Sequence, residues 1–251
     1  MTVQTDPATA REPLSLEEAR RRLMEAAMMH VPFDGWSEAT FRAAVRDAGL
    51  SRALADAACP RGAVDLALAF HEAGDREMIR RLRSEDLSAL RFRDKIATAV
   101  RYRLEAAEDK EVVRRASSLF ALPQYAADGA RALWGTADRI WDTLGDSSDD
   151  LNWYTKRATL SGVYASTVLY WLGDESEGNA ATWEFLDRRI ADVMQVERLK
   201  AQVQDNPVLK RVFAGPLWLA GQVRPPARAP EVKLPGHLGA DSPLSGATPP
   251  G

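Results

Sequence analysis

The stretch 149–171 reads D-D-L-N-W-Y-T-K-R-A-T-L-S-G-V-Y-A-S-T-V-L-Y-W and decides how the chain folds. Asp150 or Asn152 can cap the start of a helix, because their side chains accept hydrogen bonds from the backbone of the first turn. A helical repeat then places five residues on one face: Trp153, Leu160, Tyr164, Thr167 and Trp171. The stretch therefore predicts a long helix, Asn152–Leu172, with one apolar face.

Two adjacent aromatic residues near the start of this helix, Trp153 and Tyr154, point about 100° apart. They cannot both occupy the centre of one buried face, so at least one of them lies off the core. Aromatic residues beside Lys156 and Arg157 are the composition in which protein interfaces concentrate binding energy. The pattern indicates a contact surface, and packing of both rings under a neighbouring loop fits the periodicity equally well.

Charge and composition exclude several classes of protein. The 251 residues carry 33 Lys and Arg against 36 Asp and Glu, so no positive field gathers nucleic acid. The one cysteine, Cys59, forms no internal disulfide, and we expect a buried, inert thiol in a reducing compartment. The N-terminus has no apolar run typical of a secretory signal, and no window reaches about 18 continuous apolar residues. We expect an intracellular protein without a membrane-spanning helix.

Helical periodicity dominates from about Leu14 to Leu219, and strand signals are nearly absent. The expected helices are Ser15–His30, Glu38–Ala48, Arg52–Ala58, Ala63–Glu72, Asp75–Arg83, Ser88–Ala107, Lys110–Ala121, Ala127–Leu144, Asn152–Leu172 and Asn179 to about Val203. The pattern predicts an all-α bundle of nine or ten helices. Within it we expect a disordered start over 1–13, a helix-turn-helix-like part over 14–73 and a helical bundle over 74–204.

The segment 205–223 departs from the bundle pattern. Asn206 and Pro207 suit the start of a helix. Its apolar residues are Val208, Leu209, Val212, Phe213, Leu217 and Trp218, and Lys210 and Arg211 face the other way. Such a short segment with one apolar and one basic side suits the membrane interface, although a final core helix is the alternative. The Pro/Gly-rich tail 224–251 is expected to be disordered.

No catalytic or metal-binding motif is present in the sequence. It contains no Gly-rich phosphate loop, no G-x-S-x-G elbow and no H-E-x-x-H. A di-iron site needs Glu-x-x-His pairs, and none of His30, His71 and His237 has a glutamate three residues before it. We therefore predict no catalytic residue, no metal site and no cofactor, and a protein that is not an enzyme.

The first three helices resemble the start of a TetR-type regulator. A first helix is followed by G-W-S-E-A-T-F at Gly35–Phe41 and by A-A-V-R-D-A-G-L-S-R at Ala43–Arg52. In such proteins the third helix enters the major groove with basic and polar side chains. Here that helix offers Arg52 together with Asp56, whose charge phosphates repel. We expect the fold without DNA binding, and a regulator with a hydrophobic ligand pocket is the second hypothesis.

Six blocks between about Leu14 and Trp218 carry a closer resemblance. They are F-D-G-W-S at Phe33–Ser37, A-G-L-S at Ala48–Ser51, L-P-Q at Leu122–Gln124, D-L-N-W-Y-T-K-R-A at Asp150–Ala158, L-Y-W at Leu169–Trp171 and A-T-W-E-F-L-D-R-R-I at Ala181–Ile190. With these blocks the chain resembles the Coq-nine family, lipid-binding accessory proteins of ubiquinone biosynthesis. The N-W-Y-T-K-R-A block is the most specific of the six.

The resemblance implies a TetR-like homodimer that holds a lipid, an isoprenoid quinone precursor, in a cavity. It also implies contact with the membrane surface through the C-terminal segment, which Pro216 interrupts here. A surface patch is expected to dock a demethoxyubiquinone hydroxylase, through Asp150, Asn152, Trp153 and Tyr154 with Arg157 supporting them. The lack of a targeting presequence suggests a bacterial member, cytoplasmic and peripherally associated with the inner membrane.

The long helices supply the candidate lipid-binding residues. These are Leu119, Leu133, Ile140, Leu160, Val163, Tyr164, Val168, Trp183 and Leu186, with Ile96 and Val100 as further candidates. In a TetR-like bundle the same residues are equally compatible with a plain core. An apolar interior of this kind is expected to offset the loss of bilayer contacts, about 0.8 kcal/mol for each buried methylene.

Overall fold

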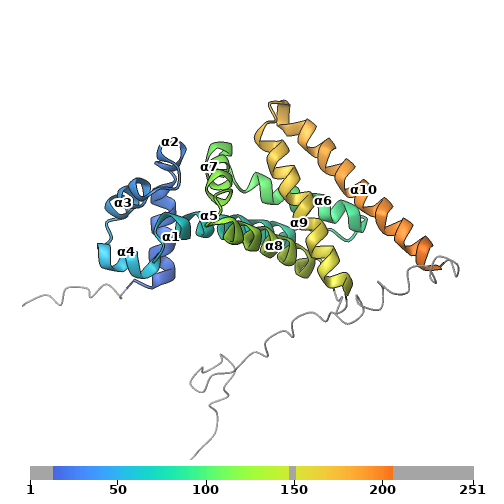
Figure 1. Cartoon of the computed structure of the whole chain (residues 1–251), viewed down its shortest axis with the longest axis horizontal. Coiled ribbons are helices and arrows are strands. Elements are labelled where there is room, and N and C mark those ends of the chain that lie inside the picture. Colours follow the sequence, from blue (N-terminus) through green and yellow to red (C-terminus); the bar gives the residue numbers. More distant parts are fainter. Residues whose placement is uncertain (1–13, 147–150, 206–251) are drawn as a thin grey trace, which may run out of the picture.

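The computed structural model describes residues 14–146 and 151–205, with the side chains of residues 14–146 and 153–195. Figure 1 shows an all-helical molecule. Its helices are α1 (Leu16–Ala27), α2 (Val31–Asp34), α3 (Glu38–Asp47), α4 (Arg52–Ala58), α5 (Ala63–Ser84), α6 (Phe92–Glu105), α7 (Lys110–Phe120), α8 (Ala126–Thr143), α9 (Leu151–Leu172) and α10 (Ala180–Asp205), with a 3₁₀ turn at Glu177–Asn179. The described residues form no strand, and the all-α prediction is confirmed.

The N-terminal helices begin where the sequence supplies a capping hydroxyl. Ser15, Ser37 and Ser51 each accept a hydrogen bond from the backbone N–H three residues later, at 3.1–3.2 Å. Gly49, at φ +64°, makes the turn between α3 and α4. These short helices pack around a first buried cluster, which includes Leu23 and Phe41.

One long helix, α5, replaces the two helices predicted over Ala63–Glu72 and Asp75–Arg83. Gly74 lies in its middle without breaking it. A Cβ at Gly74 would lie 2.4 Å from Nη1 of Arg103, so the glycine makes room for a buried guanidinium. A glycine costs a helix about 1 kcal/mol relative to alanine, which is why it suggested a break. The prediction of a break is wrong, because tertiary packing outweighs this local preference.

The helix α5 connects the two halves of the molecule (Figure 1). It packs against α1 and α3 in the first half and against α6 and α8 in the second. A second buried cluster, including Met78, Val100 and Ile140, lies among α5, α6, α8, α9 and α10. No helix among the described residues is long and apolar enough to cross a membrane. The expected membrane segment, from Asn206 onward, the tail 224–251 and the start 1–13 lie outside the described residues.

Candidate functional site

Five helices, α5 to α9, surround a cavity of about 380 Å³, which we call the inner cavity. Apolar side chains make up much of its wall: Phe70, Leu104, Val113, Leu133 and Val168. Leu169 lines the cavity but is 67% exposed, so it lies at the mouth, whereas Tyr164 is 3% exposed and lies at the buried end. The volume falls in the range of about 300–1,000 Å³ that is typical of small-molecule sites.

The buried end of the inner cavity is polar. Arg103 donates from Nε to Oδ1 of Asp75 at 2.6 Å and from Nη2 to the carbonyl of His71 at 2.9 Å. Asp75 is fully buried and also accepts from the Thr136 hydroxyl at 2.9 Å and from Nη1 of Arg139 at 2.8 Å. Both carboxylate oxygens are therefore paired, which offsets the cost of burying the charge.

His71 and Tyr164 complete this polar end. Burial and the charge of Arg103 lower the pKa of His71 to about 4, so its imidazole is neutral at neutral pH. Its Nε2 lies 2.8 Å from Oγ1 of Thr136, which links the imidazole to Asp75. Burial raises the pKa of Tyr164, whose phenol therefore stays protonated, and the guanidinium of Arg103 lies 5.8 Å from the centre of that ring.

A second cavity, of about 610 Å³, lies among α6, α8, α9 and α10. Ile96, Leu160 and Ile190 contribute to its apolar wall. Phe92 and Trp141 also line it, and their ring centres are 5.4 Å apart. Among the described residues, the inner cavity and this second cavity thus border α9 on different sides, each with apolar side chains in its wall.

The nine predicted lipid-binding residues fall in three places. Leu133, Tyr164 and Val168 line the inner cavity, and Leu160 and Val163 line the second cavity. Ile140 and Leu186 are buried in the second cluster, Leu119 packs against the first, and Trp183 packs 4.9 Å from the guanidinium of Arg101. These last four line neither cavity. Helical periodicity identifies the inward face, but it does not tell which inward residues border a space.

Trp153 and Tyr154 form an aromatic patch with Trp134 of α8. The rings of Trp153 and Tyr154 meet edge to face at 4.8 Å, and Trp134 lies 5.9 Å and 6.3 Å from them. All three side chains are partly exposed, so the prediction that at least one of the adjacent rings lies off the core is confirmed. Asp150 lies outside the described residues, and Asn152 is described only as part of the backbone of α9.

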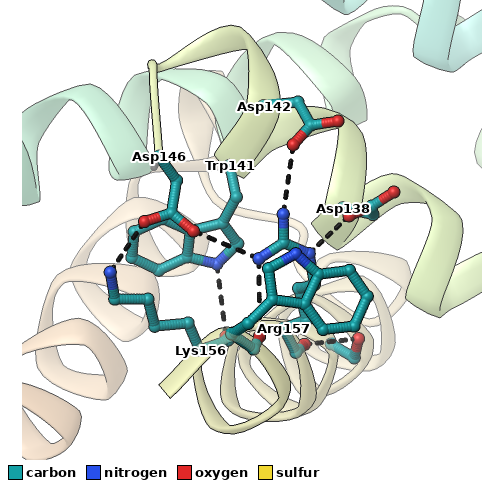
Figure 2. Close-up of polar contacts among 8 residues, drawn as sticks. Asp138, Trp141, Asp142, Asp146, Lys156 and Arg157 are labelled. Atoms are coloured by element: carbon teal, nitrogen blue, oxygen red, sulfur yellow. Dashed lines mark hydrogen bonds and ion pairs between the residues drawn. The ribbon is translucent and has the colours of Figure 1, made fainter. Parts of the chain in front are cut away.

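Arg157 lies at the centre of a group of acidic side chains next to the aromatic patch, and Figure 2 shows its contacts with Asp138, Asp142 and Asp146. Its side chain is fully buried and pairs with Asp138 through Nε, with Asp142 at 3.1 Å and with Asp146 at 3.1 Å. The guanidinium also lies 4.1 Å from the centre of the Trp153 ring. Arg157 therefore contacts the patch through Trp153 and directs its charge inward, and its role in docking a partner stays a prediction.

The three aspartates were missed by the sequence reasoning, although a signal for them exists. Asp138, Asp142 and Asp146 recur every four residues, which is the spacing of one helical face. Lys156 is held at the same corner, with Nζ 2.7 Å from Oδ1 of Asp146. Its backbone carbonyl accepts from Nε1 of Trp141 at 3.2 Å. The start of α9 is thus fixed against the end of α8 by charge.

The inner cavity and the aromatic patch meet on α8. Leu133 lines the inner cavity, and the next residue, Trp134, packs on both rings at the start of α9. Among the described residues, no group of three or more His, Cys, Asp or Glu side chains is arranged to hold a metal ion. The chemistry that this region offers is therefore an apolar space, a polar inner end and an adjacent aromatic surface.

The helix that enters DNA in TetR-type regulators corresponds to α4. Arg52 is its only basic residue, and Nε lies 2.8 Å from Oδ1 of Asp56. Nη1 of Arg52 also lies 3.4 Å from Glu38. Neighbouring carboxylates thus neutralise the charge that would meet a phosphate. The absence of DNA binding stays a prediction.

Comparison with known proteins relates the chain to one family. Residues 126–197, which cover α8, α9 and most of α10, match the family model described as COQ9. The chain is 32% identical over 203 residues to "Ubiquinone biosynthesis protein COQ9, mitochondrial" of Rattus norvegicus, with 76% of this chain and 64% of the relative covered. The chain is therefore similar to proteins of the COQ9 family. The resemblance to the Coq-nine family seen in the sequence is confirmed.

Further COQ9 relatives show the same similarity. The human protein of the same name is 30% identical, with 76% of this chain and 63% of the relative covered. The Drosophila melanogaster protein is 28% identical, with 80% and 63% covered. The chain thus spans slightly less than two thirds of the length of these relatives.

The TetR-type fold is confirmed by a solved structure. The crystal structure of a TetR transcriptional regulator from Nitrosomonas europaea matches with a TM-score of 0.57 and 17% sequence identity. The match covers 68% of this chain and 95% of the regulator. At this level of identity the likeness concerns the fold alone.

The predicted location is wrong. The sequence suggested a bacterial protein, cytoplasmic and peripherally associated with the inner membrane, whereas the COQ9 relatives are named as mitochondrial proteins. The prediction rested on the interpretation that no targeting presequence precedes the first helix. Such a segment is not part of the folded domain, so the helices and their core carry no information about it.

Proposed function

We propose that this protein is a member of the COQ9 family and a non-enzymatic accessory protein of ubiquinone biosynthesis. It binds an isoprenoid quinone precursor in the inner cavity and presents it to a demethoxyubiquinone hydroxylase docked on the aromatic patch. The observation that carries the proposal is the junction on α8, where Leu133 lines the inner cavity and Trp134 packs on the rings of Trp153 and Tyr154. The ligand and the partner thus meet neighbouring residues.

The inner cavity supports the lipid part of the proposal through its wall. A polyprenyl chain loses about 0.8 kcal/mol for each methylene that moves from an apolar surrounding into water. The apolar side chains of α5 to α9 offset that loss. The exposed Leu169 gives the polyprenyl chain an apolar entrance to the inner cavity. The protein can therefore hold a lipid that would not leave the bilayer unaided.

The aromatic patch supports the partner part of the proposal. Partly exposed tryptophan and tyrosine side chains carry much of the binding energy at protein interfaces. The buried Arg157 and its three aspartates fix the Trp153 ring before the partner arrives, so little side-chain freedom is lost on binding. The hydroxylase is the partner that the family resemblance implies.

Mass spectrometry of an organic extract of the purified protein tests the lipid part. The wild type should carry isoprenoid lipid near one per protomer. Ala165→Phe places a ring in the inner cavity and should remove most of it, whereas Ala158→Phe, at an exposed position of the same helix, should not. Retention of the lipid by Ala165→Phe would show that it binds elsewhere. An empty wild-type extract, from protein that also ignores liposomes, would contradict lipid binding altogether.

Co-purification with the hydroxylase tests the partner part. Trp153→Lys should abolish the interaction, because a charge replaces a central aromatic contact, and should leave the helical circular dichroism unchanged. Phe33→Lys is the matched control, since Phe33 is an exposed aromatic residue on α2, in the other half of the molecule. Equal binding by both variants would place the partner elsewhere, and loss of the fold in Trp153→Lys would show that the ring is structural.

The membrane contact and the homodimer stay predictions. The apolar residues Val208, Leu209, Val212, Phe213, Leu217 and Trp218, with Lys210 and Arg211, are expected to lie at the membrane interface. Liposome flotation of the full chain and of a chain ending at Asp205 measures their contribution. Equal flotation of the two chains would remove the membrane role from this segment.

A further inference from the structure

The hydroxyl of Tyr164 is buried and has no hydrogen-bond partner among the described residues. The Tyr164 side chain is 3% exposed and lines the inner cavity. Every described side-chain nitrogen or oxygen that is sealed from solvent does have a hydrogen-bond partner. The Tyr164 oxygen is therefore not sealed inside the protein. It borders the inner cavity, where a ligand atom can meet it.

The charged groups near Tyr164 are already paired with one another. Arg103 is engaged by Asp75 and by the carbonyl of His71, and Asp75 is also held by Thr136 and Arg139. A neutral imidazole at His71 adds no charge. Asp75 binds both guanidinium groups, so among the described residues the donor that has no acceptor of its own at the buried end is the Tyr164 hydroxyl, beside Arg103. A phenolic donor of this kind suits an oxygen acceptor on a ligand.

We propose that the ligand enters the inner cavity with its oxygen-bearing ring first, and that the Tyr164 hydroxyl donates a hydrogen bond to a neutral oxygen of that ring. The inference rests on the proposed function and specifies which end of its ligand, a ring with a neutral oxygen such as that of a quinone, lies at the buried end. The tail then leads toward Leu169 at the mouth.

This orientation has a consequence for presentation. Tyr164 follows Tyr154 of the aromatic patch by ten residues of α9, about 15 Å along the helix axis. Leu169, at the mouth of the inner cavity, follows Tyr154 by fifteen residues, about 22 Å along the same axis. The ring of the ligand thus lies nearer to the docking patch than its tail does. The end of the lipid that is to be modified is therefore the end nearer to a partner on the patch.

The test compares two probes that differ in their ring oxygens: decylubiquinone and decylbenzene. Quenching of tryptophan fluorescence or calorimetry gives the dissociation constant of each probe for the full chain. Tyr164→Phe should weaken decylubiquinone binding about three- to tenfold, the effect of one hydrogen bond, and leave decylbenzene within about twofold. Tyr102→Phe is the matched control, because the Tyr102 hydroxyl bonds to Glu85 and Tyr102 does not line the inner cavity.

Thermal unfolding of the ligand-free variant adds an independent readout. Tyr164→Phe should leave the midpoint unchanged, since the lost hydroxyl makes no hydrogen bond within the part of the chain that the structure describes. Unchanged decylubiquinone binding, or equal losses for both probes, would overturn the inference and leave the proposed function standing. A phosphatidylglycerol vesicle bound with the same dependence on Tyr164 would overturn the ring oxygen as the acceptor. Failure of the wild type to bind either probe would overturn the proposed function itself.

Discussion

The two buried clusters of this molecule are built on different principles. The first cluster lies among the N-terminal helices and α5, and alanine is its commonest residue, packed with larger side chains such as Leu23 and Phe41. The second cluster, among α5 to α10, lies next to the fully buried charges of Asp75 and Arg157 and next to two cavities. The first half is held by packing and capping, whereas the second half also depends on paired buried charges.

This difference distinguishes a half that is built for stability from a half that carries the proposed site. The first half also borders a cavity, of about 630 Å³, but charged side chains such as Glu18, Arg21 and Arg76 line it, so it does not suit an apolar ligand. In the second half, buried charges and open space each reduce stability unless they are compensated. Features that violate the rules of a simple core tend to mark functional sites. The three predictions below test this contrast through the free energy of unfolding.

The largest change in the free energy of unfolding is expected from the replacement of Arg157. Arg157→Leu leaves three carboxylates without their shared cation, including the nearly buried Asp146, and should reduce the free energy of unfolding by about 3–5 kcal/mol. Arg21→Leu is the matched control in the first half, where the ion pairs are exposed and their loss should change little. Urea denaturation of both variants measures the difference. Equal small losses would show that the network around Arg157 does not hold α9.

The second-largest change in the free energy of unfolding is expected when the pH is lowered, because His71 takes up a proton on unfolding. Its pKa is about 4 in the folded protein against 6.5 ordinarily, so between these values the unfolded chain takes up a proton that the folded protein does not. The free energy of unfolding should therefore fall as the pH drops from 6.5 to 4, by up to about 3 kcal/mol.

Urea denaturation at pH 7, 5.5 and 4 measures this fall. His71→Gln keeps an N–H donor for Thr136 but does not titrate, so it should lose less stability across the window. His30→Gln, which replaces a histidine paired with Asp47 on the first half, should follow the wild type. A decline in His71→Gln as steep as in the wild type would show that His71 is not the group responsible.

The smallest changes in the free energy of unfolding are expected from two glycine substitutions, and these changes have opposite signs. Gly74→Ala places a Cβ 2.4 Å from Nη1 of Arg103 and should reduce the free energy of unfolding by about 1–3 kcal/mol. Gly162 lies on α9 with open space around it, so Gly162→Ala should raise the free energy of unfolding by up to about 1 kcal/mol through helix propensity. A gain in both variants would mean that the guanidinium of Arg103 can move away from α5.

The helices could be predicted from the sequence because their signals are local. The apolar repeat in 152–172 and the capping serines Ser15, Ser37 and Ser51 each act within a turn or two. Gly74 misled the prediction because its partner, Arg103, is 29 residues away in the chain. Buried ion pairs of this kind depend on tertiary contacts that no local window contains.

The candidate site was only partly predictable. The resemblance in the N-W-Y-T-K-R-A block led to Trp153 and Tyr154, and the structure adds Trp134 as the third ring. The cavities could not be predicted, because each is a space left between side chains of several helices. Ile140 and Tyr164 share the same apolar character in the sequence, yet only Tyr164 borders the inner cavity.

The central claim is that one chain both holds the lipid and docks the hydroxylase. Turnover of demethoxyubiquinone in liposomes by the hydroxylase, with and without this protein, tests it most directly. The account predicts that the wild type stimulates turnover and that Ala165→Phe and Trp153→Lys each abolish the stimulation. A mixture of the two variants should not restore it, because the inner cavity and the aromatic patch must lie on the same chain. Full stimulation by either variant would contradict the account.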